Sequence, residues 1–177
     1  IDSLSSGLVN AGNAAMFKNF ENLSIANGTN LDASLITGIT GLTLDGAASA
    51  TLTGLTQSQS LTNNFVGDNS AGTLTLTFAA AGVAGTSDAY SITFAGTGNT
   101  SVPTAANSTT AGAVASQMGT VAAAGIENFT IVSGGTNNWN SLTLGADTSA
   151  RTVTVTGSQN LNLGFSGAFG EVNATNG

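Results

Sequence analysis

Four aspartates in short Gly- or Ser-containing turns are the side chains whose type and setting could do chemistry. Asp45 lies in "LDGA", Asp68 in "GDNSAG", Asp88 in "TSDAY" and Asp147 in "GADTS". In such turns a carboxylate and nearby backbone carbonyls can converge on a hard cation at about 2.3–2.6 Å. The turns therefore predict calcium as the cofactor. The alternative is that each aspartate hydrogen-bonds to nearby backbone and closes an Asx turn.

Two glutamates raise a related question, because each opens an apolar strand pattern. Glu21 lies in "FENLSI" and Glu127 lies in "IENFTI". Alternate residues of a strand share a face, so Glu127 falls on the apolar face with Phe129. A buried, unpaired carboxylate is costly. We therefore expect Glu127 at the rim of the core, with its oxygens accepting backbone N–H groups of the incoming turn.

The composition excludes several kinds of active site. The chain has no Cys and no His, which removes disulfides, thiolate metal sites, Ser-His-Asp triads and Cys-His dyads. A glycosidase needs two carboxylates across one sugar, usually in a cleft lined with aromatic side chains. Trp139 and Tyr90 are the only Trp and Tyr, and no carboxylate pair is singled out by spacing. We predict that the chain is not an enzyme.

The charge balance restricts the partners. Nine acidic residues against two cations give a net charge of −7, whereas phosphate binding needs several Lys or Arg. We therefore expect no nucleic-acid partner, and we interpret Lys18 and Arg151 as surface charges. Acidity with so few cations leaves a role for calcium in balancing the carboxylates. No apolar run approaches the ~20 residues of a membrane span, so we expect no direct membrane insertion.

Strict alternation of apolar and small polar residues predicts an all-β fold. The four best strand patterns are "TLTLTF" (73–78), "AYSITFA" (89–95), "RTVTVTG" (151–157) and "NLNLGF" (160–165). Clusters of Gly, Asn, Asp and Ser separate the strands every ~8–12 residues, which is the usual spacing of an all-β fold. Helical periodicity is weak. We expect one short helix near residues 11–18, and loop followed by strand over 109–124.

An internal repeat organises the chain. Residues 42–67 match 142–167 at an offset of 100, and "FENLSI" matches "IENFTI". We interpret residues 1–177 as a single elongated β domain cut from a longer protein. Its repeat units span about 20–67 and 126–167, with 68–125 between them.

Repeated strand-turn-strand units with small polar residues favour a parallel β-solenoid, in which each circuit buries its face against its neighbours. We predict a right-handed parallel β-helix, with residues 73–95 forming a protruding hairpin. The alternative is a β-sandwich with duplicated hairpins, which the same alternation permits.

Two further features have functional interpretations. The Thr rows 73-75-77 and 152-154-156 stand apart in the sequence and form no regular array, so we interpret them as solvated outer faces. Trp139 in "TNNWNS" is the candidate aromatic platform for a glycan.

The stretches "GIENFTIVSGG", "TVTVTGSQNLNLGF" and "SDAYSITFAG" resemble the β-rich repetitive regions of bacterial S-layer proteins and RTX-type adhesins exported by type I secretion. The resemblance covers about residues 19–171. It implies a secreted, calcium-stabilised β-solenoid at the bacterial cell surface that assembles into a lattice, and it carries turn-calcium roles onto Asp68 and Asp88. The Gly-Asp nonapeptides that bind calcium in that family are absent.

The expected function is that of an extracellular structural module of a self-assembling S-layer, stabilised by calcium. Self-association is the expected partnership, and cell-surface polysaccharide would be bound through other parts of the parent protein. The alternatives are a ligand- or glycan-binding adhesin module, then an ice-binding or carbohydrate-active β-helix.

Overall fold

The fold was analysed in a computed structural model, which describes residues 9–25, 28–44, 49–64, 72–96, 116–136, 139–145, 151–166 and 171–174. For residues 116–117, 139 and 171–174 the description covers the backbone and not the side chains.

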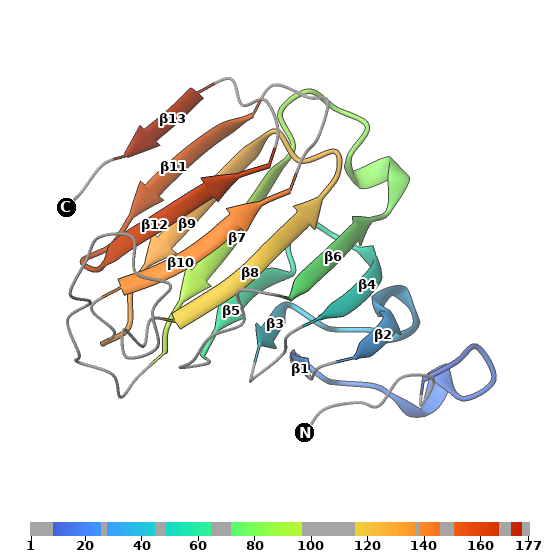
Figure 1. The fold of residues 1–177 in the computed structure, drawn as a ribbon. Helices are drawn as coiled ribbons and strands as arrows, with labels where there is room; N and C mark the ends of the chain where they lie inside the picture. The colour runs from blue at the N-terminus through green and yellow to red at the C-terminus, as the bar shows by residue number, and fades with distance from the viewer. Residues whose placement is uncertain are drawn as a thin grey trace.

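The chain folds into two parallel β-sheets that face each other (Figure 1). The first sheet has seven strands and the second has six. The first sheet runs β1 (Asn22–Ile25), β3 (Gly41–Leu44), β5 (Ser60–Asn63), β7 (Ala89–Phe94), β9 (Asn128–Ser133), β11 (Thr152–Thr156) and β13 (Glu171–Ala174). The second runs β12 (Asn160–Phe165), β10 (Trp139–Leu144), β8 (Ser116–Ala123), β6 (Thr73–Phe78), β4 (Ala50–Leu55) and β2 (Thr29–Asp32).

Consecutive strands alternate between the sheets. Each circuit of the chain therefore adds one strand to the first sheet and one to the second. The all-β prediction is confirmed, and the parallel arrangement fits a β-helix or solenoid-like fold.

The predicted hairpin over residues 73–95 is wrong. β6 lies in the second sheet between β4 and β8, whereas β7 lies in the first sheet between β5 and β9. Alternation shows which face a side chain occupies but not the direction of the next strand. The connection over 79–88 is long enough to cross the ~10 Å between packed sheets. Every pairing between the described strands is parallel, whereas the hairpins of the β-sandwich alternative would pair antiparallel strands.

Helical structure in the described residues is limited to three single 3-10 turns, η1 (Ala14–Met16), η2 (Ala33–Leu35) and η3 (Ala80–Gly82). The helix expected near 11–18 is reduced to η1. The strand expected in the second half of 109–124 is β8, while residues 109–115 lie outside the described part of the chain.

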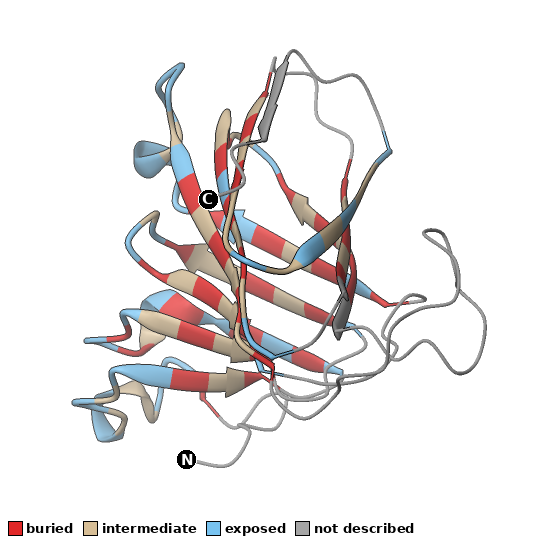
Figure 2. Ribbon diagram, turned by 90° about the vertical axis from the view of Figure 1, so that its left-hand side faces the viewer, coloured by how far each residue is buried: buried red, intermediate tan, exposed pale blue. Residues whose placement is uncertain are grey.

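The core lies between the sheets and is built of in-register columns of apolar side chains, seen as buried bands along the strands in Figure 2. One column crosses six strands of the first sheet, and all of its members are buried. Its members are Leu23, Leu42, Leu61, Ile92, Ile131 and Val155.

Two glycines allow the circuits to stack closely where strands of the first sheet end. Gly135 (φ 81°) follows β9, and Gly157 (φ 105°) follows β11. A Cβ at Gly135 would lie 2.3 Å from the Gly96 oxygen, and one at Gly157 would lie 2.4 Å from the Ser133 oxygen. Both positions therefore require glycine, by conformation and by space.

The strands matched by the sequence repeat occupy different sheets. β3 lies in the first sheet and its match β10 lies in the second, whereas β1 and β9, which carry the two glutamates, both lie in the first. The repeat at an offset of 100 thus relates strands of similar type on opposite sides of the core.

Candidate functional site

A polar column joins successive circuits where strands of the first sheet begin. The pairing of Ala89 with Asn128 sets Asp88 beside Glu127. The Asp88 N–H donates to Glu127 Oε2 (3.0 Å), and the Asp88 carbonyl accepts from the N–H groups of Glu127 (3.0 Å) and Asn128 (2.9 Å). Glu127 is half-buried. The expectation of a rim carboxylate that accepts backbone N–H is therefore confirmed.

Glu21 occupies the same position before β1, but its carboxylate is exposed. Its backbone carbonyl accepts from the N–H groups of Thr40 (2.8 Å) and Gly41 (3.0 Å), and the Asp88 carbonyl accepts in the same way from Glu127 and Asn128 three circuits later. β1 is the end strand of the first sheet among the described residues, so within them no earlier strand offers an N–H to the Glu21 carboxylate.

Among the four calcium candidates, Asp88 is the one that the structure describes. Its Oδ2 accepts from the Gly85 N–H (3.1 Å) and its Oδ1 from Gln57 Nε2 (2.8 Å). Gln57 in turn accepts the Ala89 N–H at 2.9 Å and donates to the Gly82 carbonyl. Asp88 thus closes the turn before β7 and ties it to the preceding circuit.

The other three candidates, Asp45, Asp68 and Asp147, lie outside the described residues. Within the part that is described, no group of three or more His, Cys, Asp or Glu gathers in a way that could hold a metal ion. Calcium ligation by these aspartates stays a prediction.

Arg151 is buried, with 1% of its surface exposed, so its interpretation as a surface charge is wrong. Its guanidinium donates to the carbonyls of Gly145 (3.0 Å) and Ala123 (2.8 Å) and lies 5.3 Å from the centre of the Phe129 ring. It therefore ties the ends of β8 and β10 to the start of β11. The signal was present in the sequence, since in "RTVTVT" Arg151 shares its face with Val153 and Val155. Lys18 is exposed, as predicted.

The two ends of the paired sheets differ in how well they are covered. At the first end, Val9 is buried, and Phe17 and Phe20 pack partly buried against the core. Lys18 also forms a parallel bridge with Thr37. The segment over residues 9–20 therefore covers the first circuit.

At the other end, β12 is the last strand of the second sheet and its apolar side chains are incompletely covered. Leu161, Leu163 and Phe165 lie in register with Asn140, Leu142 and Leu144. Those three residues of β10 are 0–1% exposed, whereas Leu161 and Leu163 are half-buried and Phe165 is 37% exposed. We call the apolar side chains of β12 the open end.

The two Thr rows lie on outer faces of different sheets, with 73-75-77 on β6 and 152-154-156 on β11. Both rows face outward, as expected, and one threonine of the β11 row has a threonine partner on the neighbouring strand, because Thr154 is paired with Thr130. The sequence could not show this, because the partners are 24 residues apart.

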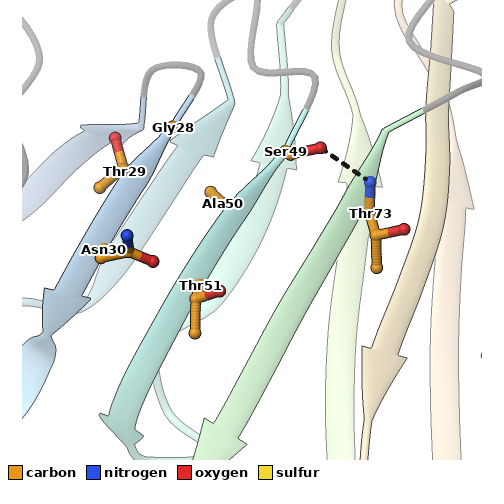
Figure 3. A pocket seen from close by; sticks show the side chains of 7 residues that line it. All are labelled: Gly28, Thr29, Asn30, Ser49, Ala50, Thr51 and Thr73. Atoms are coloured by element: carbon orange, nitrogen blue, oxygen red, sulfur yellow. Dashed lines mark hydrogen bonds between the residues drawn. The ribbon is translucent and has the colours of Figure 1, made fainter.

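A shallow hollow lies at the start of β2, β4 and β6 (Figure 3). Its volume is about 230 Å³, smaller than the ~300–1,000 Å³ usual for ligand pockets. The Thr73 N–H donates to Ser49 Oγ (3.3 Å) across it. Its lining carries no charged or aromatic side chain and consists of Gly28, Thr29, Asn30, Ser49, Ala50, Thr51 and Thr73. The hollow therefore offers neither catalytic groups nor a stacking platform.

Tyr90 is buried, and its ring packs edge-on against Phe78 at 5.0 Å between centroids. Its hydroxyl has no hydrogen-bond partner among the described residues. Burial raises the pKa of the Tyr90 hydroxyl well above its usual value. Tyr90 is thus a core side chain, and the side chain of Trp139 lies outside those described.

Comparisons with protein families, with curated proteins and with solved structures give no match. None of the helical turns in the described residues has the length and apolar character needed to cross a membrane.

Proposed function

We propose that this chain is a right-handed β-solenoid module of a self-assembling bacterial surface layer, exported to the cell surface by type I secretion. The observation that carries the proposal is the open end. In a parallel β stack, each circuit buries its apolar face only against its neighbours. Among the described strands, β12 is the last of the second sheet, its two leucines are only half-buried, and Phe165 is 37% exposed.

The occupant of the open end is a second copy of this chain. An end strand presents a row of backbone groups that are not paired within its sheet, and such a row templates pairing with another chain. The first end is covered by residues 9–20, which disfavours head-to-tail stacking. Two open ends therefore meet in an isologous contact, in which the same patch serves both copies. This contact joins copies in pairs, and contacts bridged by calcium extend the pairs into a layer.

Calcium contributes between molecules in this proposal. Nine acidic residues face two cations, and Arg151 is buried, so Lys18 is the one Lys or Arg side chain in contact with solvent. Copies brought together then repel one another, because like charges at close range are unfavourable. Oxygen-rich carboxylates are the ligands that calcium prefers, and bridging calcium relieves this repulsion.

The test compares two charge substitutions at exposed apolar side chains. Phe165→Asp places a carboxylate in the open end, and Met16→Asp makes the same change at a side chain that is 81% exposed near the covered end. We expect light scattering coupled to size exclusion to show association in the wild type and in Met16→Asp, and monomers in Phe165→Asp. Undiminished association of Phe165→Asp would overturn the proposal.

The calcium component is tested separately, by imaging wild-type assemblies with calcium and with chelator. We expect ordered assemblies only with calcium. Equal order in both conditions would remove calcium from the proposal and leave the open-end contact standing.

A further inference from the structure

The outer face of the first sheet carries a regular array of small hydroxyl side chains. Thr43, Thr62 and Thr93 follow one another in register across β3, β5 and β7, with Ser24 before them on β1. The column continues through Val132 to Thr156. A second column runs beside it, from Ser91 through Thr130 to Thr154.

The array is two residues wide on four consecutive strands. The paired positions are Ser60 and Thr62 on β5, Ser91 and Thr93 on β7, Thr130 and Val132 on β9, and Thr154 and Thr156 on β11. None of these eight residues is charged, and all are half-buried or exposed. We call this set the hydroxyl array.

The spacing of the array follows from the geometry of the parallel sheet. Neighbouring strands lie about 4.7–4.9 Å apart, and residues i and i+2 lie about 6.6 Å apart at a rise of ~3.3 Å per residue. The pairings of the first sheet show no register shift, so the repeat is not interrupted.

The second sheet provides an internal comparison. Its register shifts between Leu52 and Leu55 and again between Ser141 and Thr143. Its outer face also carries the exposed Asp32. The hydroxyl array therefore combines hydroxyl side chains, an unbroken repeat and eight uncharged positions, whereas the second sheet has two breaks in its register.

The side chains of the array are also preorganised. Thr and Val are branched at Cβ and restricted at χ1, so the methyl and hydroxyl groups keep nearly fixed positions. Each hydroxyl offers one donor and two acceptor lone pairs. When a ligand binds such a surface, little side-chain entropy is lost, and this favours affinity.

We propose that the hydroxyl array binds ice. The array repeats neutral groups in two directions, so the ligand that matches it should also repeat in two directions. The surface of a crystal is such a ligand. Ice is a neutral lattice of hydrogen-bond donors and acceptors, which suits hydroxyl groups that can both donate and accept. An ionic mineral would call for charged side chains, and a crystalline polysaccharide for aromatic ones, and the array has neither.

The experiment uses two matched threonines on opposite outer faces. Thr93→Lys places a long charged side chain in the middle of the hydroxyl array, and Thr75→Lys makes the same change at a half-buried outer position of β6. Ice shaping, thermal hysteresis and inhibition of ice recrystallisation are measured on the full chain. Circular dichroism melts confirm that each variant remains folded.

We expect the wild type and Thr75→Lys to shape ice and inhibit recrystallisation, and Thr93→Lys to lose both activities. Absence of ice activity in the wild type would overturn the proposal, as would equal loss in both variants. Binding of the wild type to crystalline cellulose or chitin in place of ice would also overturn it. The Phe165→Asp variant separates this inference from the proposed assembly, because its array is intact.

Discussion

Equivalent residues in interior and terminal circuits have different surroundings. Glu127, in an interior circuit, accepts the Asp88 N–H from the strand before it, whereas Glu21, in the first circuit, is exposed. Leu142 on β10 is 1% exposed, whereas its register partner Leu163 on β12 is half-buried. In a stack of circuits the role of a residue is thus set by whether a neighbour lies on each side.

The largest predicted effect is in the interior, at Arg151. Arg151→Ala should lower the free energy of unfolding by about 3–5 kcal/mol, because two buried carbonyls each lose a donor at about 1–3 kcal/mol, and the contact with the Phe129 ring is lost as well. Denaturant unfolding followed by circular dichroism measures the change.

Lys18→Ala is the matched control, because it removes the other cation from an exposed terminal position. It should change stability by no more than about 0.5 kcal/mol. Similar losses in the two variants would mean that burial of Arg151 does not distinguish the two sites.

The second prediction compares two leucines that are paired in register, Leu142 on the interior strand β10 and Leu163 on the end strand β12. Leu142→Ala should cost about 2–4 kcal/mol, within the range for a fully buried leucine. Leu163→Ala should cost about 1 kcal/mol, since less apolar surface is removed from water there. The measurement is done at concentrations where the chain is monomeric. If Leu163→Ala cost as much as Leu142→Ala, the end would not be open.

The third prediction compares the two glutamates. Glu127→Gln should cost about 1 kcal/mol, because a charge-assisted hydrogen bond becomes a neutral one. Glu21→Gln should be neutral to within about 0.5 kcal/mol, since its carboxylate is exposed. The two changes are chemically identical, so a difference between their midpoints of denaturation measures the effect of the neighbouring strand alone.

The smallest effect at neutral pH is expected at Tyr90. Tyr90→Phe should be neutral or stabilising by up to about 1 kcal/mol, because it removes a buried hydroxyl that has no partner among the described residues. Alkaline pH enlarges the difference in free energy of unfolding between the wild type and Tyr90→Phe. Below pH ~10 the hydroxyl is protonated in both states, whereas above it the unfolded chain releases the proton and the buried side chain does not.

The free energy of unfolding of the wild type should therefore fall by about 1.4 kcal/mol per pH unit above ~10 through this residue. Tyr90→Phe should remove that part of the slope. Identical alkaline profiles would show that Tyr90 is hydrated in the folded chain.

Alternation in the sequence predicted correctly which side chains face the core. Leu74 and Leu76 on β6, and Ile92 on β7, are buried as the pattern indicates. The same alternation places Arg151 on the core face. It was predicted at the surface because arginine is usually found there. The rim position of Glu127 was predictable because an unpaired carboxylate cannot be buried deeply.

The order of the strands within each sheet and their register were beyond the reach of the sequence. Nothing in "TLTLTF" distinguishes a hairpin partner of β7 from a neighbour of β4 and β8, because both bury the same leucines. The hydroxyl array and the open end depend on pairing between strands 19–39 residues apart. Such features are properties of the stack, and no single strand carries them.

The stacking of circuits also has a mechanical consequence. Each strand is hydrogen-bonded only to the circuits before and after it. Under tension, the last circuit can peel away while the rest of the stack keeps its contacts, so extension should proceed one circuit at a time from the open end. A chain built in this way yields to force in a series of small steps and absorbs work at each one.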